Sequence, residues 1–252
     1  MLLDTLTDLT HAIAQGSLLV LPLMRMQPAA FRALRAEVAD IVTTHEPHRD
    51  LTEFRARLTE RGTWQVHTLY SPSGRLNDMA HDQKFFVADR RFNAPEQPQL
   101  ARLFALFDGR LNAFNITHAP PGSRLMRHTD PVFFPAAPGP KAQAIEGKMV
   151  RVRLHLPLDS NADSYTQFAT RRFALDEGLL YFLNTNVPHA AANDGVTSRF
   201  HCILDLWLDD WLFTKLFAPA PGDVDLAPLH RLSVVERADL LTRAELTTAL
   251  AS

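Results

Sequence analysis

The sequence predicts a mainly β protein with flanking helices, an α+β arrangement in a chain of 252 residues. Three observations lead to this prediction. Apolar residues recur at helical spacing near both ends of the chain, and period-two alternation marks its middle. Turns rich in glycine and proline separate the alternating segments. A chain of this length can bury a sizeable core as one domain.

Three helices are expected in the first part of the chain. The first begins after Asp4 or Thr5, residue types that cap helix N-termini. The second begins near Pro28, because proline suits the first turn of a helix. A third is expected over about residues 98–107, where leucine and phenylalanine form one face.

The middle of the chain is predicted to be rich in strands, of which residues 148–158 form the clearest. Valine and leucine alternate there with Arg151, Arg153 and His155. The polar face is either solvated or, in a barrel with a ligand cavity, turned towards that cavity. The pattern alone leaves both readings open. Further strands are expected at residues 65–70, 84–88, 111–117, 123–130, 171–175, 179–183 and 198–208.

The connections between these strands follow from turn residues. Residues 131–141 are rich in proline, alanine and glycine and are expected to form a loop over the mouth of a site. Segments 171–175 and 179–183 are expected to pair through the intervening turn. A hairpin is expected to bring residues 198–208 back beside His189.

The end of the chain changes character after a linker at residues 218–222. Capping-box patterns beginning at Ser233 and Thr242 predict two short helices. We expect this tail to cover the β-rich core or to mediate self-association. The protein is therefore expected to be a monomer or a homodimer.

Two histidines and one aspartate form a candidate metal site. His128 and Asp130 are separated by one residue, so on an extended segment both side chains point to the same face. His189 has to come from a neighbouring strand. Two imidazoles and one carboxylate are the ligand set of non-haem Fe(II) oxygenases. Arg199 follows and offers a planar fork that suits a carboxylate.

Composition narrows the class of protein and its surroundings. The 26 basic and 28 acidic residues nearly balance, and no basic run appears, so nucleic acid is not an expected partner. The single cysteine, Cys202, excludes an intramolecular disulfide and fits a reducing compartment. The apolar run at residues 17–24 is too short to span a membrane and lacks a basic segment before it. We expect a cytoplasmic protein without membrane contact.

Four blocks of the sequence, in order, resemble the aspartyl/asparaginyl β-hydroxylase family, which includes bacterial hydroxylases of free amino acids. The blocks are Arg153-Leu-His-Leu-Pro-Leu158, Gly178-Leu-Leu-Tyr-Phe-Leu-Asn-Thr185, Pro188-His189 and Arg199-Phe-His-Cys-Ile-Leu-Asp-Leu-Trp207. The resemblance covers about residues 110–210. It implies a cupin-like double-stranded β-helix, a jelly-roll of two facing sheets.

The resemblance also implies domain limits. The jelly-roll core is expected at about residues 60–210, within a dioxygenase domain at residues 1–217. Residues 218–252 are expected to form a helical extension.

The resemblance further implies Fe(II), 2-oxoglutarate and O₂ as cofactor and co-substrates. By position, His128, Asp130 and His189 are the expected iron ligands. Arg199 is expected to bind the distal carboxylate of 2-oxoglutarate. Arg153 and His155 match a family Arg-x-His pair that touches co-substrate or substrate carboxylates.

Substrate-binding residues are predicted from the needs of a free amino acid. Its carboxylate requires a cationic partner, for which Arg124, Arg151 and Arg153 are candidates. Aromatic and amide side chains are expected around the same pocket. Apart from Arg153, such residues more often have structural roles. The pocket candidates are Trp64, His67, Asn115 and Asn184.

These observations favour hydroxylation of an unactivated C–H bond in a small molecule, a free or derivatised amino acid, with release of succinate and CO₂. Three alternatives remain open. The same chemistry can act on an aspartyl or asparaginyl side chain of a protein or peptide. The chain can be a non-catalytic metal-binding cupin. It can also be a zinc hydrolase, for which the sequence identifies no clear general base.

Overall fold

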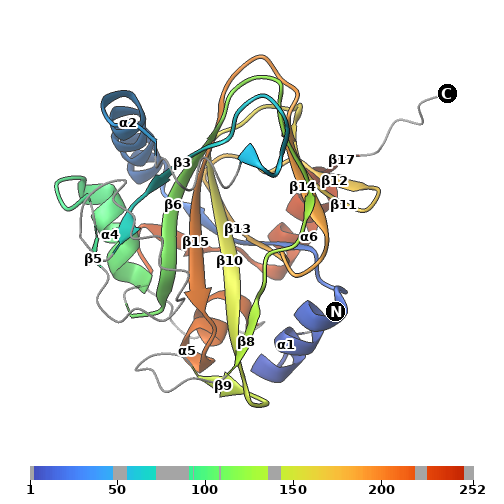
Figure 1. Ribbon diagram of the computed structural model, residues 1–252. Coiled ribbons are helices and arrows are strands. Elements are labelled where there is room, and N and C mark those ends of the chain that lie inside the picture. Colours follow the sequence, from blue (N-terminus) through green and yellow to red (C-terminus); the bar gives the residue numbers. More distant parts are fainter. Residues whose placement is uncertain are drawn as a thin grey trace.

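The computed structural model describes residues 3–47, 56–71, 91–92, 94–107, 109–135, 143–218 and 226–246. The centre of the described part consists of two antiparallel sheets that face each other (Figure 1). The order of the larger sheet is β16 (Leu229–Arg231), β1 (Val20–Met26), β13 (Leu179–Leu183), β10 (Lys148–Asp159), β15 (Arg199–Trp207), β6 (Leu111–Ala119) and β3 (Gln65–Thr68). Two short strands, β8 (Phe133–Pro135) and β9 (Ala144–Ile145), also pair with β10.

The smaller sheet has the order β17 (Glu245–Leu246), β12 (Arg171–Phe173), β11 (Ser164–Phe168), β14 (His189–Asn193), β7 (Ser123–His128) and β2 (Thr59–Arg61). A separate pair joins β4 (Tyr70–Ser71) to β5 (Arg91–Phe92). The helices are α1 (Leu6–Gln15), α2 (Pro28–Thr44), α4 (Pro98–Phe107), α5 (Asp210–Leu212), the π-helix η1 (Phe213–Phe217) and α6 (Val234–Ala244).

The chain winds between the two sheets in the manner of a double-stranded β-helix. From β6 in the larger sheet it crosses to the smaller sheet with β7, returns with β10 and crosses again with β11 and β12. β13 then lies in the larger sheet, β14 in the smaller and β15 in the larger. This eight-stranded winding is a jelly-roll, which confirms the predicted fold class.

The predicted helices near the start of the chain are confirmed. α1 begins after Thr5, whose hydroxyl accepts a hydrogen bond from the Asp8 N–H in a capping box. α2 has Pro28 in its first turn, and α4 has the expected limits. None of the described helices is long and apolar enough to cross a membrane.

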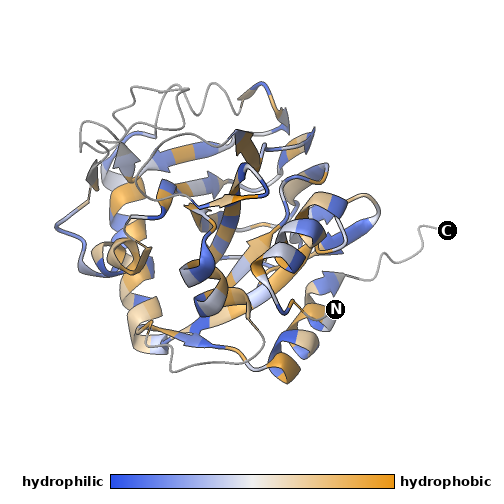
Figure 2. Cartoon of the chain, turned by 90° about the horizontal axis from the view of Figure 1, so that it is seen from below, coloured by the Kyte–Doolittle hydropathy of each residue, from blue (hydrophilic) through white to orange (hydrophobic). Residues whose placement is uncertain are grey.

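The main apolar core lies between the helices and the larger sheet. The apolar face of β10 packs in one cluster with α2 and α4. The opposite face of β10 carries Arg153 and His155 into a pocket between the sheets. This confirms the cavity-lining reading of the alternating strand. The helices in Figure 2 carry both apolar and polar stretches, as expected for helices that cover one side of a sheet.

Two predicted strand pairings are wrong. Segments 171–175 and 179–183 do not form a hairpin, because β12 pairs with β11 and β17, whereas β13 pairs with β1 and β10. Every residue of β13 is buried, as befits a central strand with a neighbour on each side. Likewise, β15 does not pair with β14 but lies between β10 and β6 in the opposite sheet.

Two predicted local structures also need correction. The expected loop at residues 131–141 contains strand β8, which pairs with β10, and residues 136–142 lie outside the described part. The second capping box in the tail does not begin a helix. Thr242 lies inside α6, where its hydroxyl donates to the Ala238 carbonyl at 3.0 Å. The helix that Ser233 caps simply continues through this position. The strand expected at residues 84–88 lies outside the described residues.

Residues 226–246 extend both sheets. β16 pairs with β1 at one edge of the larger sheet, and β17 pairs with β12 at one edge of the smaller sheet. α6 packs against β1, and its Leu240 joins a cluster with Phe173 and Tyr181. A division of the chain at residue 217 stays a prediction.

Arg237 is predicted to anchor α6. Its buried guanidinium donates to the carbonyls of Leu232, Leu23 and Leu216 at 3.2, 3.4 and 3.1 Å. Arg237→Met should lower the free energy of unfolding by about 2 kcal/mol, because buried carbonyls lose their donor. Urea denaturation measures this. Arg243→Met on the same helix is the control, since Arg243 is exposed. Equal effects of the two variants would contradict this role.

Candidate metal centre

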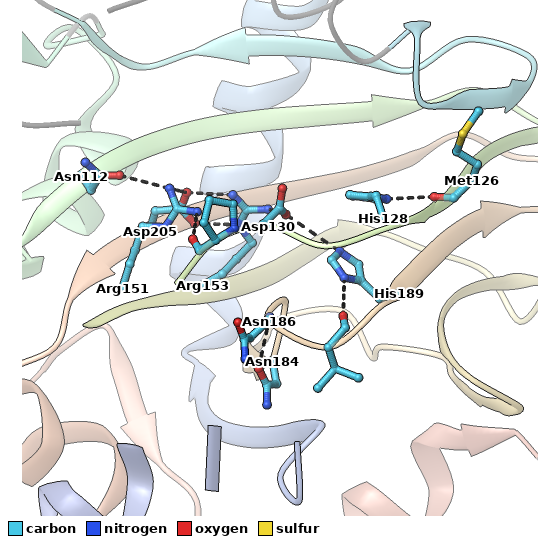
Figure 3. A network of polar contacts seen from close by, with 12 residues as sticks. Asn112, Met126, His128, Asp130, Arg151, Arg153, Asn184, Asn186, His189 and Asp205 are labelled. Atoms are coloured by element: carbon cyan, nitrogen blue, oxygen red, sulfur yellow. Dashed lines mark hydrogen bonds and ion pairs between the residues drawn. The ribbon is translucent and has the colours of Figure 1, made fainter. Parts of the chain in front are cut away.

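Strands β7 and β14 bring the two predicted histidine ligands together. His128 at the end of β7 is the register partner of His189 at the start of β14, and the ring centroids lie 4.4 Å apart. Asp130 follows β7, and its N–H donates to the Thr185 carbonyl at 2.9 Å. Ligand atoms of these three residues all lie within 4.8 Å of one another. The structure thus assembles the predicted triad (Figure 3).

Backbone carbonyls set the tautomers of both histidines. Nδ1 of His128 lies 2.8 Å from the Met126 carbonyl oxygen, and Nδ1 of His189 lies 3.0 Å from that of Val187. A carbonyl only accepts, so Nδ1 carries the proton in each ring. In the neutral ring the lone pair is then on Nε2. Such outer hydrogen bonds are the usual means of orienting metal-binding histidines.

Burial keeps His189 neutral. Loss of solvent, and then the neighbouring His128, lowers the pKa of His189 to about 4. Metal binding requires the neutral imidazole, so His189 is in the competent form near neutral pH. Two imidazoles beside one carboxylate form the donor set that the sequence predicts.

Arg153 connects the metal-site aspartate to a second buried aspartate. Its Nη1 donates to Oδ2 of Asp130, while Nε and Nη2 donate to the two oxygens of Asp205 at 2.7 and 2.8 Å. Burial opposes the charged forms of both Arg153 and Asp205. Even so, the two aspartates hold the pKa of Arg153 above its usual value, and the neighbouring arginines hold the pKa of Asp205 below its own.

Arg199 is buried in a different environment. It is 3% exposed and has no carboxylate within ion-pair distance among the described residues. Its guanidinium carbon lies 5.2 Å from the centroid of the Trp64 ring, a cation–π contact. Burial lowers the pKa of Arg199 to about 9. The group is still mainly cationic at neutral pH, and a buried cation of this kind favours an anionic ligand.

Two buried histidines lie beside Arg199. Nη2 of Arg199 is 3.2 Å from Nδ1 of His201, which in turn is 3.3 Å from Nδ1 of His155. A guanidinium only donates, so Nδ1 of His201 accepts and the ring proton lies on Nε2. That buried Nε2 has no hydrogen-bond partner among the described residues. Burial, and then the charge of Arg199, keeps the pKa of both histidines well below the usual value.

One pocket between the sheets is lined both by the two candidate histidine ligands and by Arg199. Side chains from the larger and the smaller sheet line it together. The lining residues are Trp64, Thr117, Leu125, His128, Arg153, His155, Thr166, Leu183, Thr185, His189, Ala191, Arg199 and Ile203.

The predicted substrate residues are only partly brought to this pocket. Trp64 and Arg153 line it. Asn115 lies opposite the lining residue Ile203 in the strand register but is not among the described lining residues. Arg124 is not brought there either, since it forms a bidentate pair with Asp194 at 2.7 and 2.8 Å. These assignments stay predictions.

Three other candidates are held by the fold. Arg151 is buried near Asp205, with 3.4 Å between Nη1 and Oδ2. The amide of Asn184 donates to the carbonyls of Ile13 and Leu18. His67 pairs with Ile116 in the strand register and is 1% exposed.

Sequence reasoning missed Asp205 and three threonines of the pocket, Thr117, Thr166 and Thr185. Asp205 had a usable signal, because it shares the parity of Arg199 and His201 in an otherwise apolar strand. The threonines had none, since threonine is common in strands and in turns.

The sequence matches the model of the family described as aspartyl/asparaginyl beta-hydroxylase over residues 29–208. The chain therefore belongs to this family, whose members are hydroxylases of the Fe(II)/2-oxoglutarate oxygenase type. A search of curated proteins finds no match.

Solved structures show similarity at low sequence identity. A Pseudomonas putida prolyl-4-hydroxylase is 17% identical, with a TM-score of 0.39 over 80% of this chain and 99% of that chain. AviO1 from Streptomyces viridochromogenes Tue57 is 15% identical, with a TM-score of 0.42 over 84% and 97%. The family assignment rests on the sequence match and not on these structures.

His67 should make the protein less stable in acid. Burial, and then the charges of His118 and His45, lower the pKa of His67 from 6.5 to about 4. The unfolded chain thus takes up a proton below pH 6.5 that the folded protein takes up only near pH 4. In that window the residue costs up to roughly 1.4 kcal/mol of stability per pH unit.

Urea denaturation between these pH values should therefore give a shallower pH dependence for His67→Gln than for the wild type. Exposed His11 supplies the control variant, His11→Gln. An unchanged slope in His67→Gln would show that His67 does not titrate as a buried neutral group.

Proposed function

We propose that this protein is an Fe(II)- and 2-oxoglutarate-dependent dioxygenase that hydroxylates a small molecule, a free or derivatised amino acid. The observation that carries the proposal is Arg199. This buried cation has no acidic partner in the described part of the chain and lines the same pocket as His128 and His189. A small dianion such as 2-oxoglutarate would supply the missing negative charge.

The donor set fits Fe(II). His128 and His189 would bind through Nε2, because Nδ1 of each ring faces a carbonyl. Asp130 would supply one carboxylate, completing the two-histidine, one-carboxylate set of non-haem oxygenases. When bound, Fe(II) with 2-oxoglutarate and O₂ supplies the oxidising power for C–H hydroxylation, with release of succinate and CO₂.

Arg199 would hold the distal carboxylate of 2-oxoglutarate. Its planar fork can donate two parallel hydrogen bonds, and a buried site strengthens them. Trp64 covers the guanidinium and shields it from water. His201 accepts from Arg199 and so restrains its orientation. These contacts support a fixed anion site at this end of the pocket.

Arg153 and His155 would face the reacting end of the pocket. A guanidinium has five N–H groups, and the contacts with Asp205 and Asp130 use three of them. The other two suit a carboxylate of the co-substrate or the substrate. His155 lines the same pocket and is held by His201.

The position and the lining of the pocket favour the proposal of a small substrate. It lies between the two sheets, and Arg199 and His189 within it are buried. Its cationic side chains suit the carboxylate of an amino acid, while Leu125 and Ile203 suit an aliphatic part. Action on a protein side chain is the alternative that the family name raises.

Addition of Fe(II) and then 2-oxoglutarate without oxygen should produce the visible charge-transfer band of an iron–keto acid chelate. Arg199→Met should raise the dissociation constant of 2-oxoglutarate roughly 100-fold, since a buried ionic partner is lost. His189→Ala should abolish the band. Arg35→Met is the control, because Arg35 is partly exposed and pairs with Asp159. Absence of the band in folded, iron-loaded wild-type protein would refute the proposal.

Substrate class is tested by succinate formation. Free amino acids should stimulate the conversion of 2-oxoglutarate to succinate, whereas peptides containing aspartate or asparagine should not. Mass spectrometry should then find one added oxygen atom in the stimulating amino acid. Stimulation by peptides alone would favour the protein hydroxylase, and a metal-binding protein without any turnover would favour the non-catalytic cupin.

A further inference from the structure

Asp205 is the most buried carboxylate near the metal centre. It is 2% exposed and lies on β15, in the sheet opposite the one that carries the histidine ligands. Both of its oxygens accept from Arg153, at 2.7 Å from Nε and 2.8 Å from Nη2. Two parallel bonds of this kind fix a guanidinium in one orientation.

That orientation decides what Arg153 does next. Its remaining terminal nitrogen, Nη1, donates to Oδ2 of Asp130. Asp205 therefore holds Arg153, and Arg153 holds the carboxylate of the candidate metal ligand (Figure 3). Partners that orient a ligand in this way tune metal affinity as well as geometry.

Arg151 approaches Asp205 from the same strand as Arg153. Its Nη1 lies 3.4 Å from Oδ2 of Asp205 and 3.4 Å from Oδ1 of Asn112. Its Nη2 donates to the Pro131 carbonyl at 2.7 Å. Pro131 follows Asp130 directly, but the N–H of Asp130 itself donates to the Thr185 carbonyl at 2.9 Å, so the backbone at the ligand keeps this anchor without Arg151.

The charges in this buried group balance. Arg151 and Arg153 face Asp205 and Asp130, two cations against two anions. Without Asp205 the group would carry excess positive charge beside the place where a divalent cation would bind. Charges interact strongly in a buried environment, so this excess would oppose metal binding.

We propose that Asp205 is a positioning residue for the metal centre. It holds Arg153 against Asp130 and offsets the charge of both arginines, which lets the site retain a divalent cation. The inference rests on the proposed metal centre, but it concerns residues that do not touch the metal. A purely structural ion pair would affect stability without a defined effect on metal affinity.

The sign of the charge that is removed distinguishes a positioning role of Asp205 from a purely structural one. Removing the negative charge in Asp205→Asn should weaken metal binding, whereas removing a positive charge in Arg151→Gln should not. The double variant restores the balance and should recover most of the affinity. Loss of packing alone would make both single variants weaker binders and the double variant weaker still.

The experiment is a titration of the metal-free protein with Co(II), followed by visible absorption and calorimetry. We expect Asp205→Asn to raise the dissociation constant of Co(II) by roughly 10- to 100-fold. Asp209→Asn is the matched control. Asp209 also accepts from an arginine, Arg110 at 2.7 Å, but Arg110 lies over the Trp211 ring, whereas Arg153 donates to Asp130.

A dissociation constant for Asp205→Asn within about twofold of the wild type would overturn the inference, because such outer partners normally change affinity tenfold or more. If Asp205→Asn does not fold, Arg151→Gln decides, and weaker Co(II) binding by that variant overturns the inference. If His189→Ala binds Co(II) as tightly as the wild type, the metal centre itself is refuted. That result differs from a failure of the role of Asp205 alone.

Discussion

Charge confined between two sheets is the constraint on which the pocket depends. A buried ion without partners costs several kcal/mol, so a buried arginine needs either a counter-charge or several hydrogen-bond acceptors, as Arg237 finds in three carbonyls. Arg153 obtains this charge from Asp205 and Asp130. Arg199 obtains none from the described residues and contacts only neutral groups, Trp64 and His201. The two ends of the pocket therefore differ, one neutralised by the protein and the other suited to an anion.

Strand register places these groups. β7 and β14 pair so that His128 and His189 face each other, while β10 and β15 pair so that Arg153 lies opposite Asp205. A shift of β10 by one residue would exchange its polar and apolar faces and move Arg153 out of the pocket. The apolar residues of β10, packed against the helices, oppose such a shift. The same hydrophobic contacts that stabilise the fold thus hold the site in register.

Much of this could be predicted from local patterns. Caps located α1 and α6, and residue types with their spacing suggested the metal triad. Partners across the fold could not be read in this way. Apolar runs that pair with distant strands look the same as apolar runs that form hairpins, which is why β12 and β13 were wrongly paired. The polar face of β10 could likewise be assigned to a cavity only once the facing sheet was known.

Arg124 and Asp205 show the same limit from opposite sides. Arg124 is a candidate cation for the substrate carboxylate, yet its Nε and Nη2 donate to Asp194, seventy positions along the chain. Asp205 drew no attention, yet it fixes the arginine that touches Asp130. Sequence gives the chemical type of a side chain, but a charged group acts according to its nearest counter-charge. In a jelly-roll that counter-charge often comes from a distant strand, because most strands that follow one another in the sequence lie in opposite sheets.

The two roles of Arg153 are compatible and have a consequence for binding. Its family counterpart is expected to touch a carboxylate, and two of its N–H groups lie beyond its contacts with the aspartates. A carboxylate bound there would share the Arg153 guanidinium with Asp130. The guanidinium would then neutralise the charge of Asp130 less completely. Asp130 would then interact more strongly with a cation. Because such coupling is reciprocal, metal and keto acid would each strengthen the binding of the other.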